Sequence, residues 1–112
     1  MKEALIELPD QPVNPISTIL WAARVEAWAG IGVLVENTGS ETVTVRIETR
    51  LADTGDYAPR PVDDLVDIAA GAAKQFDADS SLSMWFALVG TATGAGSTAK
   101  VSLLLSRGGR PW

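Results

Sequence analysis

The 112-residue sequence contains no cysteine and no histidine. Without cysteine the chain has no disulfide bond, no catalytic thiol and no cysteine-type zinc site. Without histidine it lacks the commonest general base and metal ligand, which excludes most common hydrolase designs. We therefore expect a protein that is not an enzyme and that has no cofactor, catalytic site or metal site.

Basic residues are few, since nine Lys and Arg stand against fourteen Asp and Glu and leave a net charge of −5. Such a charge repels phosphate backbones and anionic membrane surfaces, so we expect neither nucleic acid nor a membrane as a partner. The first residues, MKEALIELPDQP, carry two acids and no long apolar run, which is not the pattern of a secretory signal. No later segment is apolar over a bilayer-spanning length. We expect a protein made in a cytoplasm.

The clearest structural signal is the run IGVLVENTGSETVTVRIET at residues 31–49. Apolar residues alternate on both sides of an Asn-Thr-Gly-Ser turn, in which Asn37 can bond its own backbone and Gly39 can take a positive φ. The pattern predicts a β-hairpin whose register is set locally. The residues predicted to face inward are Ile31, Val33, Val35, Val43, Val45 and Ile47.

Residues 16–29 fit two structures. Asn14 and Pro15 are typical of a helix N-cap and first helical residue. Read with period two, alternate residues from Ile19 onward, Trp21 among them, form one face of a strand. We favour the strand, because the neighbouring segments are strands and context overrides propensity.

Further strands are predicted at residues 65–70, 73–78, 81–91 and 100–106, the second of them near a sheet edge. About seven short strands separated by turn signals indicate an all-β fold, an antiparallel β-sandwich of immunoglobulin-like or jelly-roll-like type. Prolines in residues 1–15 predict an extended N-terminal arm, which either folds back on its own domain or reaches a neighbouring subunit. Residues 16–107 would form the sandwich and residues 108–112 a C-terminal tail.

Two acidic features are candidates for a catalytic site or a metal site. Asp53-Thr54-Gly55 resembles the triplet of dimeric aspartic proteases, in which two carboxylates share a proton. Asp56 follows it and adds a charge, and we favour a simple turn. A calcium site is the second possibility, although the EF-hand spacing is missing and a solvated loop explains the acids as well. The carboxylates concerned are Asp53, Asp56, Asp63, Asp64 and Asp67.

Four tryptophans are many for a domain of this size, and aromatic anchors are enriched at protein interfaces. We assign Trp21 and Trp85 to the core. Apolar points on the arm and aromatic residues in exposed segments are the candidates for partner contact. These candidates are Leu5, Ile6, Leu8, Trp28, Tyr57 and Trp112.

Two families resemble this chain. The runs VENTGSETVTVRIETR and IAAGAAKQFD resemble the hairpin and later Ala-Gly turn of bacterial immunoglobulin-like adhesion modules. With the closing run WFALVGTATGAGSTAKVSLLLSR they also resemble small β-sandwich proteins that tailed bacteriophages place on their capsids as decoration or head-fibre-base subunits. The phage resemblance covers most of residues 16–107 and implies a structural role without catalytic residues.

The resulting hypothesis is a virion structural protein that oligomerises, as a trimer in the favoured case, and binds the major capsid protein or another virion protein. An adhesion or carbohydrate-binding module is the alternative, in which exposed aromatics stack on sugar. A dimeric aspartic protease that uses Asp53 is the second alternative.

Overall fold

The computed structural model describes residues 2–25, 30–50, 58–59, 65–79 and 84–107. All regular structure in this part of the chain is β-strand, which confirms the predicted all-β class. Three of the ten strands have three residues or fewer. The strands are β1 Lys2–Glu7, β2 Gln11–Val13, β3 Thr18–Val25, β4 Gly30–Asn37, β5 Val43–Arg50, β6 Ala58–Pro59, β7 Val66–Ile68, β8 Ala73–Asp79, β9 Met84–Ala92 and β10 Ser97–Arg107.

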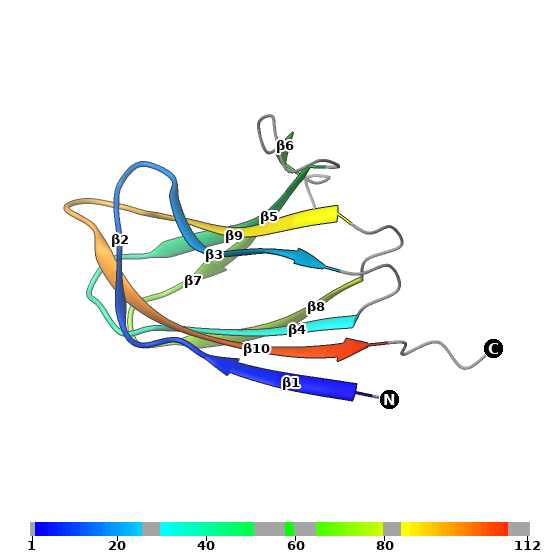
Figure 1. The fold of residues 1–112 in the computed structure, drawn as a ribbon. Coiled ribbons are helices and arrows are strands. Elements are labelled where there is room, and N and C mark those ends of the chain that lie inside the picture. The colour runs from blue at the N-terminus through cyan, green and yellow to red at the C-terminus, as the bar shows by residue number, and fades with distance from the viewer. Residues whose placement is uncertain (1, 26–29, 51–57, 60–64, 80–83, 108–112) are drawn as a thin grey trace.

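The strands form two antiparallel sheets that face each other as a sandwich (Figure 1). Sheet A has the order β1-β10-β4-β8, with β2 also paired to β10. Sheet B has the order β3-β9-β5, with β6 and β7 paired to different parts of β5. Without β2 and β6, the remaining eight strands have the strand order of a jelly roll. The chain is therefore the jelly-roll kind of sandwich and not the immunoglobulin kind.

The core lies between the sheets and is built by the alternating apolar residues of both. All six residues predicted to face inward from the run 31–49 are buried. From sheet A they meet Val101 and Leu103, and from sheet B they meet Phe86 and Leu88. β9 is buried on both faces, because Ala87 and Val89 on its other face are also covered. Apolar residues on both faces of a strand are typical of one that is covered on each side.

The predicted hairpin at residues 31–49 is wrong. β4 pairs with β10 and β8 in sheet A, whereas β5 pairs with β9, β6 and β7 in sheet B. The turn therefore carries the chain across the sandwich from one sheet to the other (Figure 1). Register is set by partners distant in sequence and not by this turn. Inward apolar faces are the same in a hairpin and in such a crossing, which is why alternation alone did not separate them.

The turn residues take other roles than the sequence suggested. Gly39 N donates to Asn37 Oδ1 at 3.1 Å, so the predicted side-chain bond of Asn37 is confirmed. Gly39 does not have a positive φ, which is found instead at Gly71, Gly94 and Gly96. A Cβ at position 39 would lie 2.6 Å from Thr98 N. Glycine is needed at this position for close approach between chain segments.

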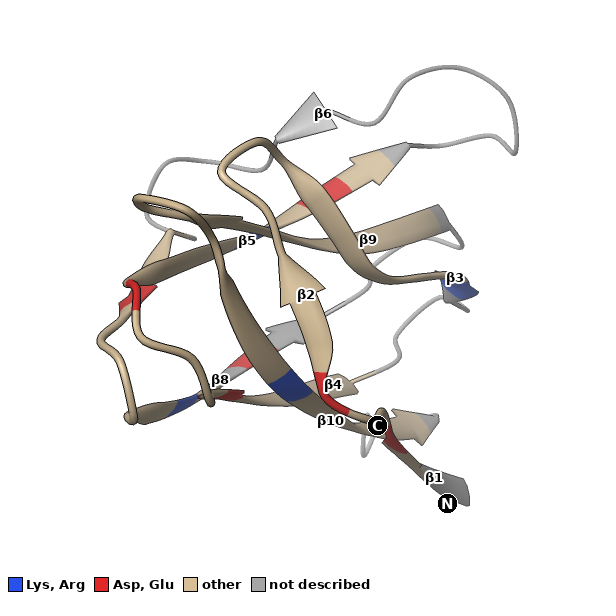
Figure 2. Cartoon of the chain, turned by 90° about the vertical axis from the view of Figure 1, so that its left-hand side faces the viewer, with Lys and Arg blue, Asp and Glu red and all other residues tan. Residues whose placement is uncertain are grey.

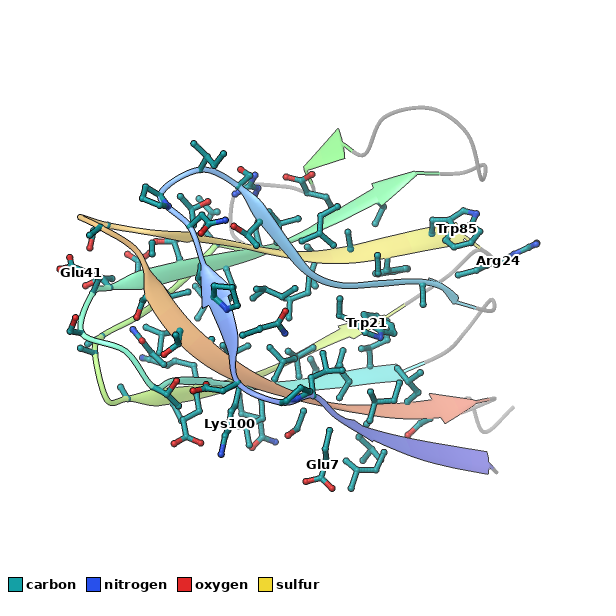
Figure 3. The ribbon with its side chains drawn as sticks, turned by 60° about the vertical axis from the view of Figure 1, so that its left-hand side comes forward. Glu7, Trp21, Arg24, Glu41, Trp85 and Lys100 are labelled. Atoms are coloured by element: carbon teal, nitrogen blue, oxygen red, sulfur yellow. The ribbon has the colours of Figure 1, made fainter. Side chains whose placement is uncertain are left out.

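Residues 18–25 form strand β3, which confirms strand over helix for this part of residues 16–29. The prediction that Ile19 and Trp21 share one face is wrong, because a β-bulge lies between these two residues. The bulge adds one residue and shifts the alternation, so that Leu20 is 5% exposed and Ile19 is 55% exposed. Trp21 still packs against the core, as Figure 3 shows.

The N-terminal residues lie along sheet A of their own chain. β1 pairs with β10 from Lys2 opposite Arg107 to Glu7 opposite Ser102, and β2 pairs with the start of β10. In the order of sheet A, β1 and β8 are the two edge strands.

The described residues contain no helix of the length and apolarity that a bilayer span requires.

Candidate interaction surface

The outer face of sheet A carries three exposed leucines, two on the central strands β4 and β10 and one on the edge strand β1. Leu5 is 64% exposed, and Leu34 and Leu104 are each 41% exposed. Leu5 lies directly opposite Leu104, and Leu34 lies opposite Ser102, one step along the same face from Leu104. Side chains at such direct and diagonal positions are in reach of one another. We call these three residues the leucine patch.

Two hollows adjoin the leucine patch. Gly32 lies opposite Leu104 and Asp77 but has no side chain, which leaves a hollow of about 290 Å³ in the face. A second hollow of about 490 Å³ lies between Leu34 and the turn at Leu8 and Pro9. The face is therefore uneven, with apolar ridges beside depressions that a partner's side chains can enter.

The rim of the leucine patch is mainly acidic. Glu7, Glu36 and Asp77 lie on the outward positions of their strands, and Lys100 is opposite Glu36. Figure 3 shows Glu7 and Lys100 pointing away from the interior below sheet A. Figure 2 shows acidic positions on both sheets, with fewer basic positions among them. An apolar centre with a polar rim is the usual anatomy of a protein interface.

The backbone at the β1 edge is also available. Leu8 N donates to Val101 O at 2.9 Å, which fixes the direction of the even-numbered amides toward β10. Because amide directions alternate along a strand, the amides and carbonyls of Glu3, Leu5 and Glu7 point away from β10. In the described structure no strand pairs with that side of β1. Apolar surface and unpaired backbone thus meet at Leu5.

A buried polar centre closes the end of the sandwich opposite the chain termini. Asn37 is fully buried, and its Nδ2 donates to Glu41 O at 2.6 Å and to Ile68 O at 2.9 Å. Its Oδ1 accepts from Ser97 Oγ at 2.8 Å in addition to Gly39 N. This one side chain joins the β4–β5 turn to the end of β7 and the start of β10. Its hydrogen-bonding capacity is used within the fold, so it holds the fold and offers nothing to a ligand.

The predicted contact residues divide into three groups. Leu5 is exposed in the leucine patch. Ile6 and Leu8 are half-buried and pack against the protein's own core. Trp28, Tyr57 and Trp112 lie outside the described residues, so their role stays a prediction.

The predicted acidic sites are described only in part. Asp53, Asp56, Asp63 and Asp64 lie outside the described residues. Asp67 is described, and its Oδ1 accepts a hydrogen bond from Thr44 Oγ1 at 2.7 Å. No group of three metal-ligating side chains occurs among the residues that the structure places.

Sequence reasoning missed Leu34 and Leu104, although the signal was present. The inward residues Val33 and Val35 leave Leu34 on the outer face, and Leu103 and Leu105 do the same for Leu104. A leucine at an outward position of a regular alternation marks an exposed apolar point.

Comparison with known proteins gives a fold and no family. No protein-family model matches the chain, and no curated protein sequence matches it significantly. The structure is similar to a chain of Bacillus endospore appendages, a family of disulfide-linked pili, with a TM-score of 0.66 and 14% identity over 94% of this chain and 86% of that one. A chain from infectious bursal disease virus, Gx strain, gives a TM-score of 0.46 and 14% identity; this protein spans 35% of its length. At this identity the likeness to the appendage chain shows the fold alone.

Proposed function

We propose that this protein is a non-enzymatic structural subunit of a tailed-phage virion, which associates with itself and attaches to the capsid lattice as a decoration or head-fibre-base subunit. The observation that carries the proposal is the leucine patch with its acidic rim on the outer face of sheet A. The jelly-roll fold is compatible with this role, because viral capsid proteins use the same architecture.

Burial of the leucine patch would supply the attachment. Covering the exposed parts of three leucines contributes on the order of 2–4 kcal/mol per contact, which is weak for a single subunit. Several linked subunits that bind a repeating lattice at once multiply this contribution through avidity. A modest apolar surface on a small subunit is sufficient for an assembled coat.

The likeness to the endospore appendage supports an assembly role only at the level of architecture. That protein forms disulfide-linked pili, whereas this chain has no cysteine among its 112 residues. Contacts made by this chain are therefore not disulfide-linked. Any assembly should be unchanged by a reducing agent and should depend on the apolar patch.

Immunogold labelling would test the location. An antibody raised against the purified protein is applied to virions purified from the source culture and viewed by electron microscopy. Label on capsids or head fibres is the expected result. Label on cell-surface filaments would indicate an appendage subunit, and a protein found only in the cytosol would contradict the proposal.

A matched pair of variants tests the surface. Purified Leu34→Lys/Leu104→Lys protein is incubated with capsids that lack the native subunit, and the bound fraction is measured by co-sedimentation. The charges interrupt the leucine patch, so the Kd for the capsid should rise at least about tenfold. This rise corresponds to a loss of about 1.4 kcal/mol in binding free energy. Ile16→Lys is the control, because Ile16 is 75% exposed and lies outside the patch. Equal binding by all three proteins would rule out the patch as the attachment surface.

A further inference from the structure

The edge of sheet A at β1 carries charged residues but lacks three other features that usually prevent strands from pairing between molecules, namely proline, a β-bulge and very short length. The strand has six residues, no proline and a continuous register with β10. Its neighbour along that edge, β2, has three residues and contains Pro12. On sheet B, β3 is bulged and β6 and β7 are short. Long edge strands with a regular register are templates for another strand.

We propose that β1 pairs antiparallel with β1 of a second copy across a two-fold axis, with Leu5 opposite Leu5 of that copy. This inference specifies the self-association in the proposed function and rests on it. The two copies of sheet A would become one continuous sheet, and the two leucine patches would meet at the axis. The partner is therefore a second copy of this chain, recognised by strand addition.

The register follows from the open amides. Outward residues of one copy must lie opposite outward residues of the other, because side chains alternate across a strand. With Leu5 opposite Leu5, Glu3 lies opposite Glu7, and the open N–H and C=O groups of all three residues find partners in both copies. A shift of two residues that places Glu3 opposite Pro9 leaves the carbonyl of Glu3 without a partner, because proline has no amide hydrogen.

The other full-length edge of sheet A, β8, is a poorer partner for β1. Every antiparallel register that pairs residues 3–7 with β8 and keeps outward residues on one face places Leu5 opposite Gln75 or Asp77. An acidic or amide group beside the leucine patch gains no apolar burial. Pairing of β1 with β8 would also repeat without closing and yield an open polymer. Pairing of β1 with itself closes at two copies.

The proposed pairing has a built-in electrostatic cost. Glu3 of one copy lies opposite Glu7 of the other, and this happens twice, once on each side of the axis. Like charges directly opposite are destabilising, and salt screens them at exposed sites. Sodium chloride should therefore strengthen this dimer. An interface held by ion pairs would show the reverse dependence.

Sedimentation equilibrium over a range of protein concentrations tests the dimer. Wild-type protein should show a monomer–dimer equilibrium. Leu5→Pro removes an amide that points away from β10, so it should abolish the dimer while circular dichroism and Tm remain close to wild type. Leu5→Thr keeps the amide and should weaken the dimer much less than the proline does. A wild-type monomer at all concentrations, or a dimer that survives Leu5→Pro, would overturn the proposal.

Glu7→Lys tests the register. The introduced lysine would lie opposite Glu3 of the second copy at both ends of the pairing, which replaces two repulsions by two attractions. We expect the dimer Kd to fall about tenfold, and added salt should now weaken the dimer. An unchanged Kd and an unchanged salt dependence would exclude this register. A molar mass that keeps rising with protein concentration beyond that of a dimer would instead indicate β1–β8 pairing, and it would also overturn the two-fold dimer.

These outcomes are separable from a failure of the proposed function. Capsid binding is measured with the Leu34→Lys/Leu104→Lys pair, whose changes leave the β1 backbone intact. A capsid-bound protein that is monomeric in solution would reject the β1 dimer alone. A dimer that binds no capsid would reject the virion role alone.

Discussion

Asn37 is the polar side chain that the described core buries completely, and its four side-chain hydrogen bonds join the β4–β5 turn to the ends of β7 and β10. Its backbone is engaged as well, since Asn37 N donates to Ala72 O and Gly71 N donates to Asn37 O. An amide is the group that fits, because it combines two donors for two carbonyls with an acceptor for Gly39 N and Ser97 Oγ. Neither a carboxylate nor a hydroxyl matches this set.

We expect Asn37→Ala to lower the free energy of unfolding by about 2–4 kcal/mol, because buried partners lose their hydrogen bonds. Asn37→Asp should cost at least as much, since a carboxylate would face two carbonyl oxygens. Urea denaturation measures both. Thr38→Ala is the control, because this exposed hydroxyl bonds only to Asp10 and Thr98 at the surface. A loss for Asn37→Ala no larger than for the control would contradict the role of Asn37.

At the scale of the element, β3 shows how one bulge changes which residues matter. The extra residue between Ile19 and Trp21 places Leu20 in the core and Ile19 on the surface. An uninterrupted alternation would give these two residues the opposite positions. The difference is large in energetic terms, because only the buried residue leaves a cavity when it is shortened.

Leu20→Ala should therefore lower the free energy of unfolding by about 2–4 kcal/mol, whereas Ile19→Ala should change it by less than about 0.5 kcal/mol. Thermal and urea unfolding of the two proteins give the comparison directly. Each variant serves as the control of the other, since they are adjacent and lose similar apolar volume. Equal losses would show that the bulge is absent in solution.

The sequence predicted elements better than it predicted their partners. Inward faces at Val33, Val45 and Leu103 follow from period two and were correct, because each depends only on local alternation. Pairing of β4 with β10 joins residues more than sixty positions apart, which no local pattern contains. The turn at Asn37 has the composition of a tight turn whether the chain stays in one sheet or crosses to the other. The position of a bulge and the crossing of the chain between sheets depend on contacts with segments distant in the sequence.

The candidate surface was predictable to the same extent. Leu34 and Leu104 are visible as outward leucines once the strands are known, but their adjacency depends on the β4–β10 register. Ile6 and Leu8, which were predicted to contact a partner, are half-buried against the protein's own core because β1 lies along β10, and their contact with a partner stays a prediction. A short apolar arm carries no local information on whether its own sheet or another molecule covers it.

At the scale of the whole molecule, the chain passes repeatedly between the two sheets. β3 leads to β4, β4 to β5, β7 to β8 and β9 to β10, and each pair is divided between sheet B and sheet A. Neither sheet is a continuous piece of chain, and both cover the same core. We infer that neither sheet can unfold while the other remains.

Leu103→Ala in sheet A and Phe86→Ala in sheet B should each lower the midpoint of one and the same unfolding transition. Far-UV circular dichroism reports both sheets. Tryptophan fluorescence, measured in proteins that also carry Trp28→Phe and Trp112→Phe, reports Trp21 and Trp85 in sheet B. The two signals should coincide during urea denaturation for the wild type and both variants. Separate midpoints for the two probes in either variant would show that the sheets unfold independently.

The pairing of β1 with β10 also has a mechanical consequence. Lys2 lies opposite Arg107, so the first and last described strands begin and end side by side (Figure 1). Tension applied between these two ends would load the hydrogen bonds between β1 and β10 one residue pair at a time and would separate β1 from the sheet. Optical-tweezer extension from residues 2 and 107 should therefore show β1 detaching at low force before the core yields. The protein should therefore withstand a load applied to the faces of its sheets better than one applied between residues 2 and 107.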